Sequence, residues 1–143
     1  MNQIAILYPV FVQVLLVLTV ACLMAFARAR AIKAMERQRG NPDLPRGKTV
    51  WPEDAAKRAA NYINQFELPV LFYVLTILEI VTRHADVVFV VLAWIFVLAR
   101  IGQAYVHTTS NVVIQRGVIY AIGAVTLIVM WIVFIVRILL GLP

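Results

Sequence analysis

The sequence predicts an all-α integral membrane protein, a four-helix bundle with both termini outside. Hydrophobic residues make up 63% of the 143 residues, charged residues make up only 14%, and the mean hydropathy is +0.90. Soluble domains have roughly 45–50% apolar and about 25% charged residues. A chain this apolar could not cover its hydrophobic side chains with its own polar surface, so we expect lipid to cover them.

Four apolar runs are long enough to cross a membrane. The first, Ile4–Phe26, is uncharged for 23 residues, enough for a hydrocarbon core of about 30 Å. No basic residue precedes this run, so it is not expected to be a cleaved signal peptide. The other runs are Phe66–Val81, Val87–Val106 and Gly117–Val136. We expect one domain over residues 1–143, with helices at about 4–38, 52–82, 86–108 and 115–140.

Basic residues predict how the bundle is oriented. Lys and Arg near the ends of membrane spans prefer the cytoplasmic side. The loop at 27–65 is rich in them, whereas the loop between the second and third spans holds only Arg83. The first and third loops are therefore expected in the cytoplasm, and the small size favours the inner membrane of a bacterium. Because topology explains the net charge of +6, no nucleic-acid partner is expected.

The first loop contains one clear break between helices. Residues 40–47 include two prolines and two glycines, which cannot continue a helix. A new helix is expected to begin near Pro52, where Glu53 and Asp54 would meet the positive helix N-terminus. We expect this helix to run to residue 81, with a kink near Pro69.

Polar residues inside the spans cluster at one depth. They recur at spacings of three or four, which places those of each helix on one side. With the orientation above, the polar residues of all three helices meet at one level, the cytoplasmic third of the membrane. These residues are Asn61, Asn64 and Glu67 on the second helix, Arg100, Gln103 and His107 on the third, and Arg116 and Tyr120 on the fourth.

Two interpretations of this cluster stay open. The polar groups could satisfy one another, with Glu67 paired to Arg100. Alternatively, they could rim a pocket that takes a charged molecule from the cytosol and an apolar one from lipid. In the second interpretation, Glu67 is expected to be the one buried acid, and the basic residues around it outnumber it. Such an excess of positive charge suits an anionic or zwitterionic ligand. The bases are Arg28, Arg30, Arg58, Arg100 and Arg116.

Other polar residues carry weaker signals. Cys22 is the single cysteine, so neither an intrachain disulfide nor a multi-cysteine metal site can form. His84 and His107 are expected at opposite ends of the bundle, so we predict no metal site. At the outer end, Glu79 and Arg83 are four residues apart, and we expect an interfacial ion pair between them.

Two segments resemble the MAPEG family, the membrane-associated proteins in eicosanoid and glutathione metabolism. Residues 59–73, AANYINQFELPVLFY, are similar to that family's second-helix signature, in which an Asn is followed by Glu three residues later and then by Pro. Asn64, Glu67 and Pro69 match this signature. Residues 100–107, RIGQAYVH, with 115–117, QRG, resemble the third helix and the start of the fourth. The resemblance covers nearly the whole chain.

The resemblance implies a homotrimer that binds glutathione as co-substrate on the cytosolic side, between neighbouring subunits. It implies that Glu67 holds the glutathione amino group and that Asn64 contacts its backbone. The carboxylates would meet Arg28 or Arg30 together with Arg100. Arg116 would lie beside the sulfur as the catalytic residue, and the site would also include Gln103, His107 and Tyr120.

The resulting expectation is a membrane-bound glutathione transferase or peroxidase acting on hydrophobic small molecules that arrive from the bilayer. A guanidinium in a partly dry site would favour the thiolate, which is the nucleophile. Two alternatives remain. The first is a non-enzymatic scaffold or accessory subunit with a structural polar cluster. The second is a proton-coupled exporter that would use Glu67 as its coupling carboxylate, although the nearby arginines should keep that acid ionised.

Overall fold

The computed structural model describes residues 3–38, 51–110 and 112–141, and every regular element within them is a helix. The chain opens with a short 3₁₀ helix, η1 (Gln3–Ile6). The α-helices that follow are α1 (Leu7–Gln38), α2 (Glu53–Asn64), α3 (Leu68–Thr82), α4 (Val87–Thr108) and α5 (Val113–Leu140). The expected break at residues 40–47 lies outside the described residues.

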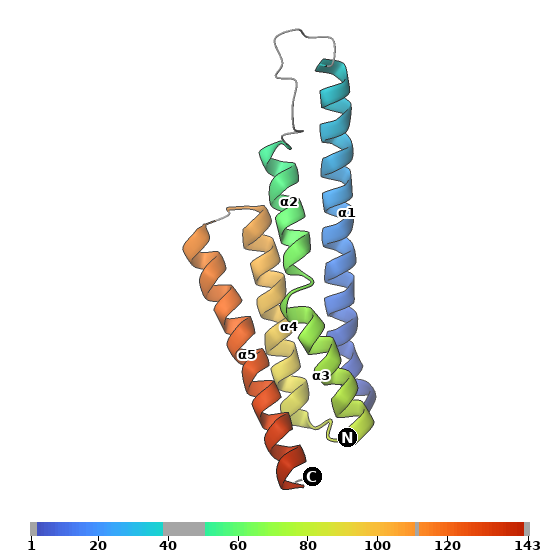
Figure 1. The fold of residues 1–143 in the computed structure, drawn as a ribbon, viewed down its shortest axis with the longest axis vertical. Coiled ribbons are helices and arrows are strands. Elements are labelled where there is room, and N and C mark those ends of the chain that lie inside the picture. Colours follow the sequence, from blue (N-terminus) through green and yellow to red (C-terminus); the bar gives the residue numbers. More distant parts are fainter. Residues whose placement is uncertain (1–2, 39–50, 111, 142–143) are drawn as a thin grey trace.

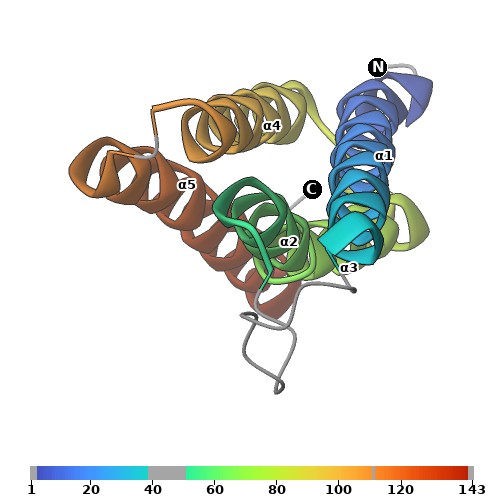
Figure 2. The ribbon, with the colours of Figure 1, turned by 90° about the horizontal axis from the view of Figure 1, so that it is seen from above.

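The helices form one elongated bundle (Figure 1). The loop end of the bundle is the end where α1 finishes and α2 begins, and the terminal end is the end where α1 begins and α5 finishes. At the loop end, α1 extends beyond α4 and α5 (Figure 1). Seen from above, α2 lies between α1 and α5 (Figure 2), and α4 packs against α1, α2 and α5. This packing brings the last turn of α2, the last turns of α4 and the first turn of α5 to the same level.

The helix expected over residues 52–81, with a kink near Pro69, is divided into α2 and α3 by a short interruption. Pro69 lies in the first turn of α3, where it lacks an N–H and its ring would clash with the carbonyl of residue 65 in a continuous helix. The last turn of α2 tightens instead, because Gln65 N donates to Tyr62 O at 3.0 Å and Phe66 N donates to Ile63 O at 2.9 Å. The junction between α2 and α3 therefore consists of residues 65–67, close to the expected kink.

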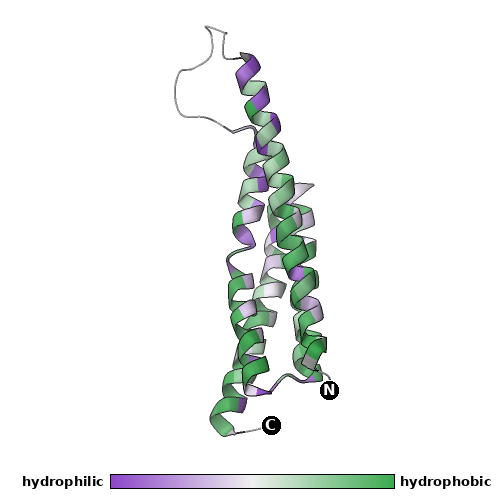
Figure 3. Ribbon diagram, turned by 90° about the vertical axis from the view of Figure 1, so that its right-hand side faces the viewer, coloured by the Kyte–Doolittle hydropathy of each residue, from purple (hydrophilic) through white to green (hydrophobic). Residues whose placement is uncertain are grey.

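Apolar side chains fill the centre of the bundle and also cover its outside. The rings of Phe72 and Phe96 stack with their centroids 4.8 Å apart, and Leu75, Leu127 and Met130 belong to the same buried cluster. The outer surface is also largely apolar, with hydrophilic residues concentrated at the loop end of α1 and α2 (Figure 3). Within the described ranges, four helical segments are long and apolar enough to cross a membrane: Ile4–Arg37, Glu53–Thr82, Val87–Thr108 and Val113–Leu140.

An ion pair joins α4 and α5 at the terminal end. Asp86 caps α4 by accepting a hydrogen bond from Phe89 N at 2.8 Å, and its other oxygen accepts one from Arg137 Nη2 at 2.6 Å. Burial alone would raise the pKa of Asp86, but the hydrogen bonds from Arg137 and Phe89 outweigh burial, so the pKa of Asp86 lies below its usual value.

Candidate functional site

A cavity of about 280 Å³ opens beside the junction between α2 and α3. Its walls come from the end of α2, the junction itself, the last turns of α4 and the first turns of α5. The lining residues are Asn64, Glu67, Gln103, Val113, Arg116, Gly117 and Tyr120. Five of these seven residues are among the sequence-predicted site residues, so the structure brings the polar side chains of separate helices to one level.

Arg100 anchors the junction through a hydrogen bond to the end of α2. Its side chain is buried, with the residue only 1% exposed, and Nη2 donates to the backbone carbonyl of Asn64 at 2.6 Å. Nη1 donates to the side-chain oxygen of Gln103. Carbonyls in the last turn of a helix lack intrahelical donors. Arg100 therefore supplies a donor to the interrupted chain, and its guanidinium is already engaged within the protein.

His107 connects the end of α2 to the start of α5. The residue is 3% exposed, and its Nδ1 lies 3.3 Å from the side-chain nitrogen of Asn64. Its Nε2 lies 3.2 Å from Arg116 Nη1. Arg116 thus belongs to the wall of the cavity and also contacts a buried imidazole on α4.

A ladder of buried amides continues the polar layer away from the cavity. Gln13 Nε2 donates to Gln65 Oε1 at 3.3 Å, and Gln65 Nε2 donates to Asn61 Oδ1 at 3.4 Å. Asn61 Nδ2 in turn donates to Ala104 O at 3.4 Å. The ladder ties α1 and α2 to α4. Our sequence interpretation missed Gln13 and Gln65, although Gln13 is a conspicuous polar residue within an apolar span.

The expectation that Glu67 is the buried acid was wrong. Glu67 is exposed and lies at the end of the interruption, where it precedes the first residue of α3. It forms no ion pair with Arg100 in the part of the chain that the structure describes. Glu67 nevertheless lines the cavity, where its carboxylate remains accessible to a ligand.

Among the acids that the structure describes, Glu79 is the fully buried one instead. It is 0% exposed, and neither carboxylate oxygen has a hydrogen-bond partner within the described structure. The expected ion pair with Arg83 is therefore wrong. Arg83 ends α3 in the left-handed conformation, with φ of 60°, and is exposed, whereas Glu79 turns into the bundle.

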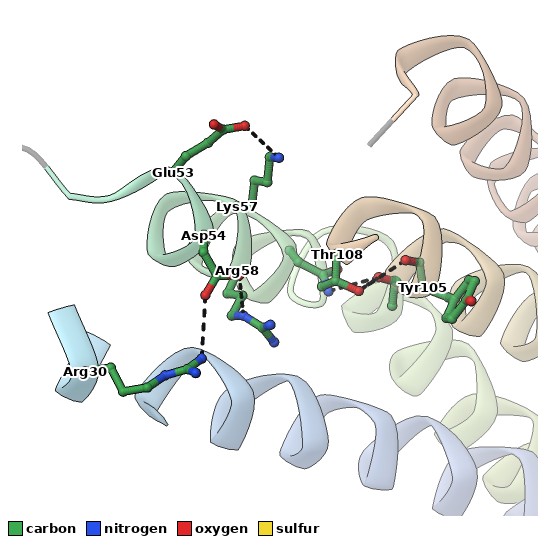
Figure 4. Close-up of polar contacts among 9 residues, drawn as sticks. Arg30, Glu53, Asp54, Lys57, Arg58, Tyr105 and Thr108 are labelled. Carbon is green, nitrogen blue, oxygen red and sulfur yellow. Dashed lines mark hydrogen bonds and ion pairs between the residues drawn. The ribbon is translucent and has the colours of Figure 1, made fainter. Parts of the chain in front are cut away.

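The two arginines of α1 lie outside the cavity. The Arg28 guanidinium carbon sits 5.2 Å from the centroid of the Trp51 ring. Arg30 Nη2 lies 3.7 Å from Asp54 Oδ2, while the other Asp54 oxygen accepts a hydrogen bond from Arg58 Nε at 3.0 Å (Figure 4). Both arginines are exposed, so their positive charge lies on the surface of α1 near the loop end.

Among the described residues, no group of three His, Cys, Asp or Glu side chains could hold a metal ion. The polar groups around the cavity are guanidinium, carboxylate, amide, imidazole and phenol groups. Together they provide donors for an anion and one carboxylate for a cation.

Comparison with known proteins identifies one match. The MAPEG family model matches residues 6–136. No curated protein and no solved structure matches the chain. The matched segment contains all four membrane-spanning segments almost completely, as well as every residue around the cavity.

Proposed function

Because the chain belongs to the MAPEG family, we propose that this multi-pass membrane protein binds glutathione, or a similar thiol, in the cavity beside the α2–α3 junction. The bound thiol is transferred to hydrophobic electrophiles or reduces lipid hydroperoxides. The observation that carries this proposal is the position of Arg116, a cationic group on the wall of a cavity that also contains the accessible acid Glu67.

The charges of the cavity complement those of glutathione. Glu67 is a suitable partner for its amino group, and Asn64 offers an amide for its peptide backbone. Arg116 on the opposite helix would lie beside the sulfur, where a guanidinium favours the thiolate over the thiol. In a transfer reaction the thiol proton leaves to solvent and the thiolate sulfur bonds to the electrophilic carbon. The leaving group departs with its bonding electrons.

The size of the cavity favours a site shared between subunits. Pockets for small molecules usually occupy roughly 300–1,000 Å³, so 280 Å³ is small for a complete glutathione site. Arg28 and Arg30 lie outside the cavity of their own chain. A homotrimer, as the family resemblance implies, would allow these arginines of an adjacent subunit to meet the glutathione carboxylates.

The same orientation would give both substrates a route to the site. With the first and third loops in the cytoplasm of a bacterial cell, the loop end would face the cytosol and glutathione would enter there. The apolar outer surface of α5, which includes Val113 at the cavity, would be in contact with lipid. A hydrophobic electrophile could then reach Arg116 from the bilayer.

One observation favours a second candidate, a membrane scaffold or accessory subunit without catalysis. Arg100, Gln103, Asn64 and His107 already form hydrogen bonds within the protein. The sole role of such a network could be to hold α2, α4 and α5 together. The accessible carboxylate of Glu67 is not part of that network, which is why we prefer the ligand-binding function.

Glutathione binding to the detergent-purified protein tests the proposal, followed by the ultraviolet absorbance of the bound thiolate. We expect wild type to give a thiolate signal and Arg116→Ala to lose it. The matched control is Arg83→Ala, which removes one exposed positive charge at the terminal end and should leave the signal unchanged. Absence of binding at millimolar glutathione would favour the scaffold. A thiolate signal that persists in Arg116→Ala would remove Arg116 from the chemistry.

A further inference from the structure

We propose that His107 is a positioning residue: a neutral imidazole that carries its proton on Nδ1 and holds the Arg116 guanidinium through Nε2. The significance of this inference for thiol chemistry rests on the proposed function. The protonation state itself follows from the contacts of His107 alone.

The contact with Arg116 determines the role of Nε2. Arg116 Nη1 lies 3.2 Å from this nitrogen. A guanidinium has five N–H donors and no acceptor, and it stays protonated in proteins. A hydrogen bond between these two groups therefore requires Nε2 to accept with its lone pair. An imidazolium has a hydrogen on both nitrogens and could not accept, so the ring that makes this bond is neutral.

The second ring nitrogen must then be the donor. In a neutral imidazole whose Nε2 accepts, the single proton is on Nδ1. This nitrogen lies 3.3 Å from Asn64 Nδ2, so two donors would face each other. A half-turn of the Asn64 amide places Oδ1 at that position instead, where it accepts from Nδ1. Both ring nitrogens of His107 then have a complementary partner, Oδ1 of Asn64 and the guanidinium of Arg116.

The charges around His107 also favour the neutral ring. Arg116 faces it from α5 and Arg100 lies on its own helix, while Asn64 on α2 is uncharged. Glu67 and Tyr120 line the neighbouring cavity. On α1, Arg28 contacts Trp51 and Arg30 contacts Asp54, both away from the ring. A proton on Nε2 would replace the acceptor with a donor and would place a third positive charge beside two arginines.

Protonation of His107 would therefore break this hydrogen bond with Arg116. The arginine lies in the first turn of α5, and its long side chain has many rotamers. A hydrogen-bond acceptor on the buried ring favours the rotamers that keep the guanidinium beside the cavity. This preference lowers the entropy cost of positioning Arg116 when a ligand binds. The arrangement makes this contact of Arg116 depend on pH.

The protonation state can be measured directly, without glutathione. The chain has two histidines, so labelling with ¹⁵N-histidine gives few signals, and His84→Gln identifies that of His107. We expect a neutral His107 with its proton on Nδ1 at neutral pH, and we expect Arg116→Ala to lose this tautomer preference. A cationic ring, a proton on Nε2, or an unchanged preference in Arg116→Ala would overturn the inference. Failure of glutathione to bind would leave this result unaffected.

Two substitutions at position 107 test the consequence for function. His107→Gln keeps a carbonyl acceptor for Arg116 that does not titrate, whereas His107→Leu removes the acceptor. We expect wild type to lose bound thiolate at acid pH with uptake of two protons, one by the thiol and one by His107. The Gln variant should lose it with uptake of one proton. The Leu variant should need a roughly tenfold lower proton concentration than wild type to reach the same thiolate fraction near neutral pH. An equal slope in wild type and His107→Gln would contradict this role, as would equal losses in the Gln and Leu variants.

Discussion

Arg100 Nη2 donates a hydrogen bond at 2.6 Å to the backbone carbonyl of Asn64, across a separation of 36 residues. The bond joins the middle of α4 to the last residue of α2, immediately before the chain is interrupted. It therefore determines where Asn64 and the junction lie relative to the cavity. The buried arginine stabilises the site through the backbone, whereas Arg116 faces the ligand space directly.

Arg100→Ala should destabilise the protein. The substitution removes a charge-assisted hydrogen bond and leaves a partly buried carbonyl without its donor, so the expected loss is about 2 kcal/mol of unfolding free energy. Unfolding in mixed micelles with increasing denaturing detergent measures it. Arg83→Ala, at an exposed position, should change stability by less than about 0.5 kcal/mol. Equal stability of Arg100→Ala and wild type would show that the Asn64 carbonyl finds another donor.

Glu67→Gln should weaken glutathione binding without changing the stability of the protein. Glu67 is exposed and forms no ion pair within the described residues, so the melting temperature should stay within the error of wild type. If Glu67 holds the amino group of glutathione, affinity should fall roughly tenfold, the effect of losing one ionic hydrogen bond. Isothermal calorimetry measures the affinity. A lower melting temperature with unchanged affinity would favour the scaffold function.

Pro69→Ala should straighten the chain between α2 and α3. Without the proline ring, the carbonyl of residue 65 no longer clashes and a continuous helix becomes possible. Spin labels on cysteines introduced at the exposed positions Ala60 and Leu71, with Cys22→Ser as background, would report a changed distance. Ligand affinity should fall because Asn64 and Glu67 would move. An unchanged distance would show that Arg100 and the amide ladder alone maintain the interruption.

Asp86→Asn should remove a pH-dependent part of the stability. The asparagine can still cap α4 by accepting from Phe89 N, so the substitution isolates the ion pair with Arg137. We expect a loss of about 1 kcal/mol at neutral pH, a modest value because Asp86 is partly exposed.

The sign of this pH dependence follows from the lowered pKa of Asp86 in the folded protein. Its contribution is fully present above the pKa of the unfolded chain, about 4, and is lost as the pH falls through the lower folded value. Melting temperatures between pH 7 and strongly acid conditions should therefore converge for wild type and Asp86→Asn. Parallel curves would contradict this assignment.

Glu79→Leu should stabilise the protein. Burying a carboxyl group that has no hydrogen-bond partner carries a desolvation penalty, and a side chain of similar size without that group avoids it. The expected gain is about 1–3 kcal/mol, measured by the same detergent unfolding. Glu36→Gln, at an exposed position on α1, serves as the control. A large loss in Glu79→Leu would mean that the carboxyl has a bound partner in the membrane.

Hydropathy along the sequence was sufficient to predict an all-helical protein with four apolar spans. A helix that crosses the hydrocarbon core needs about 20 consecutive apolar residues, and such a run can be recognised in the sequence without knowledge of the tertiary structure. The gathering of these polar residues at one level of the bundle was also predictable, because they recur at helical spacing near the ends of adjacent helices. The contacts of Asn64, Arg100, His107 and Arg116 agree with that expectation.

Tertiary structure decided which of these polar residues are buried and what they contact. The interruption at residues 65–67 exposes Glu67, whereas the regular turn of α3 directs Glu79 into the bundle, the reverse of the expectation. The bond between Gln13 and Gln65 joins residues 52 apart, and the bond from Arg100 to Asn64 uses a backbone atom. Helical spacing specifies which residues share a face, but neighbouring helices determine whether that face meets lipid, a cavity or another polar group. That choice depends on packing and hydrogen bonding between distant segments.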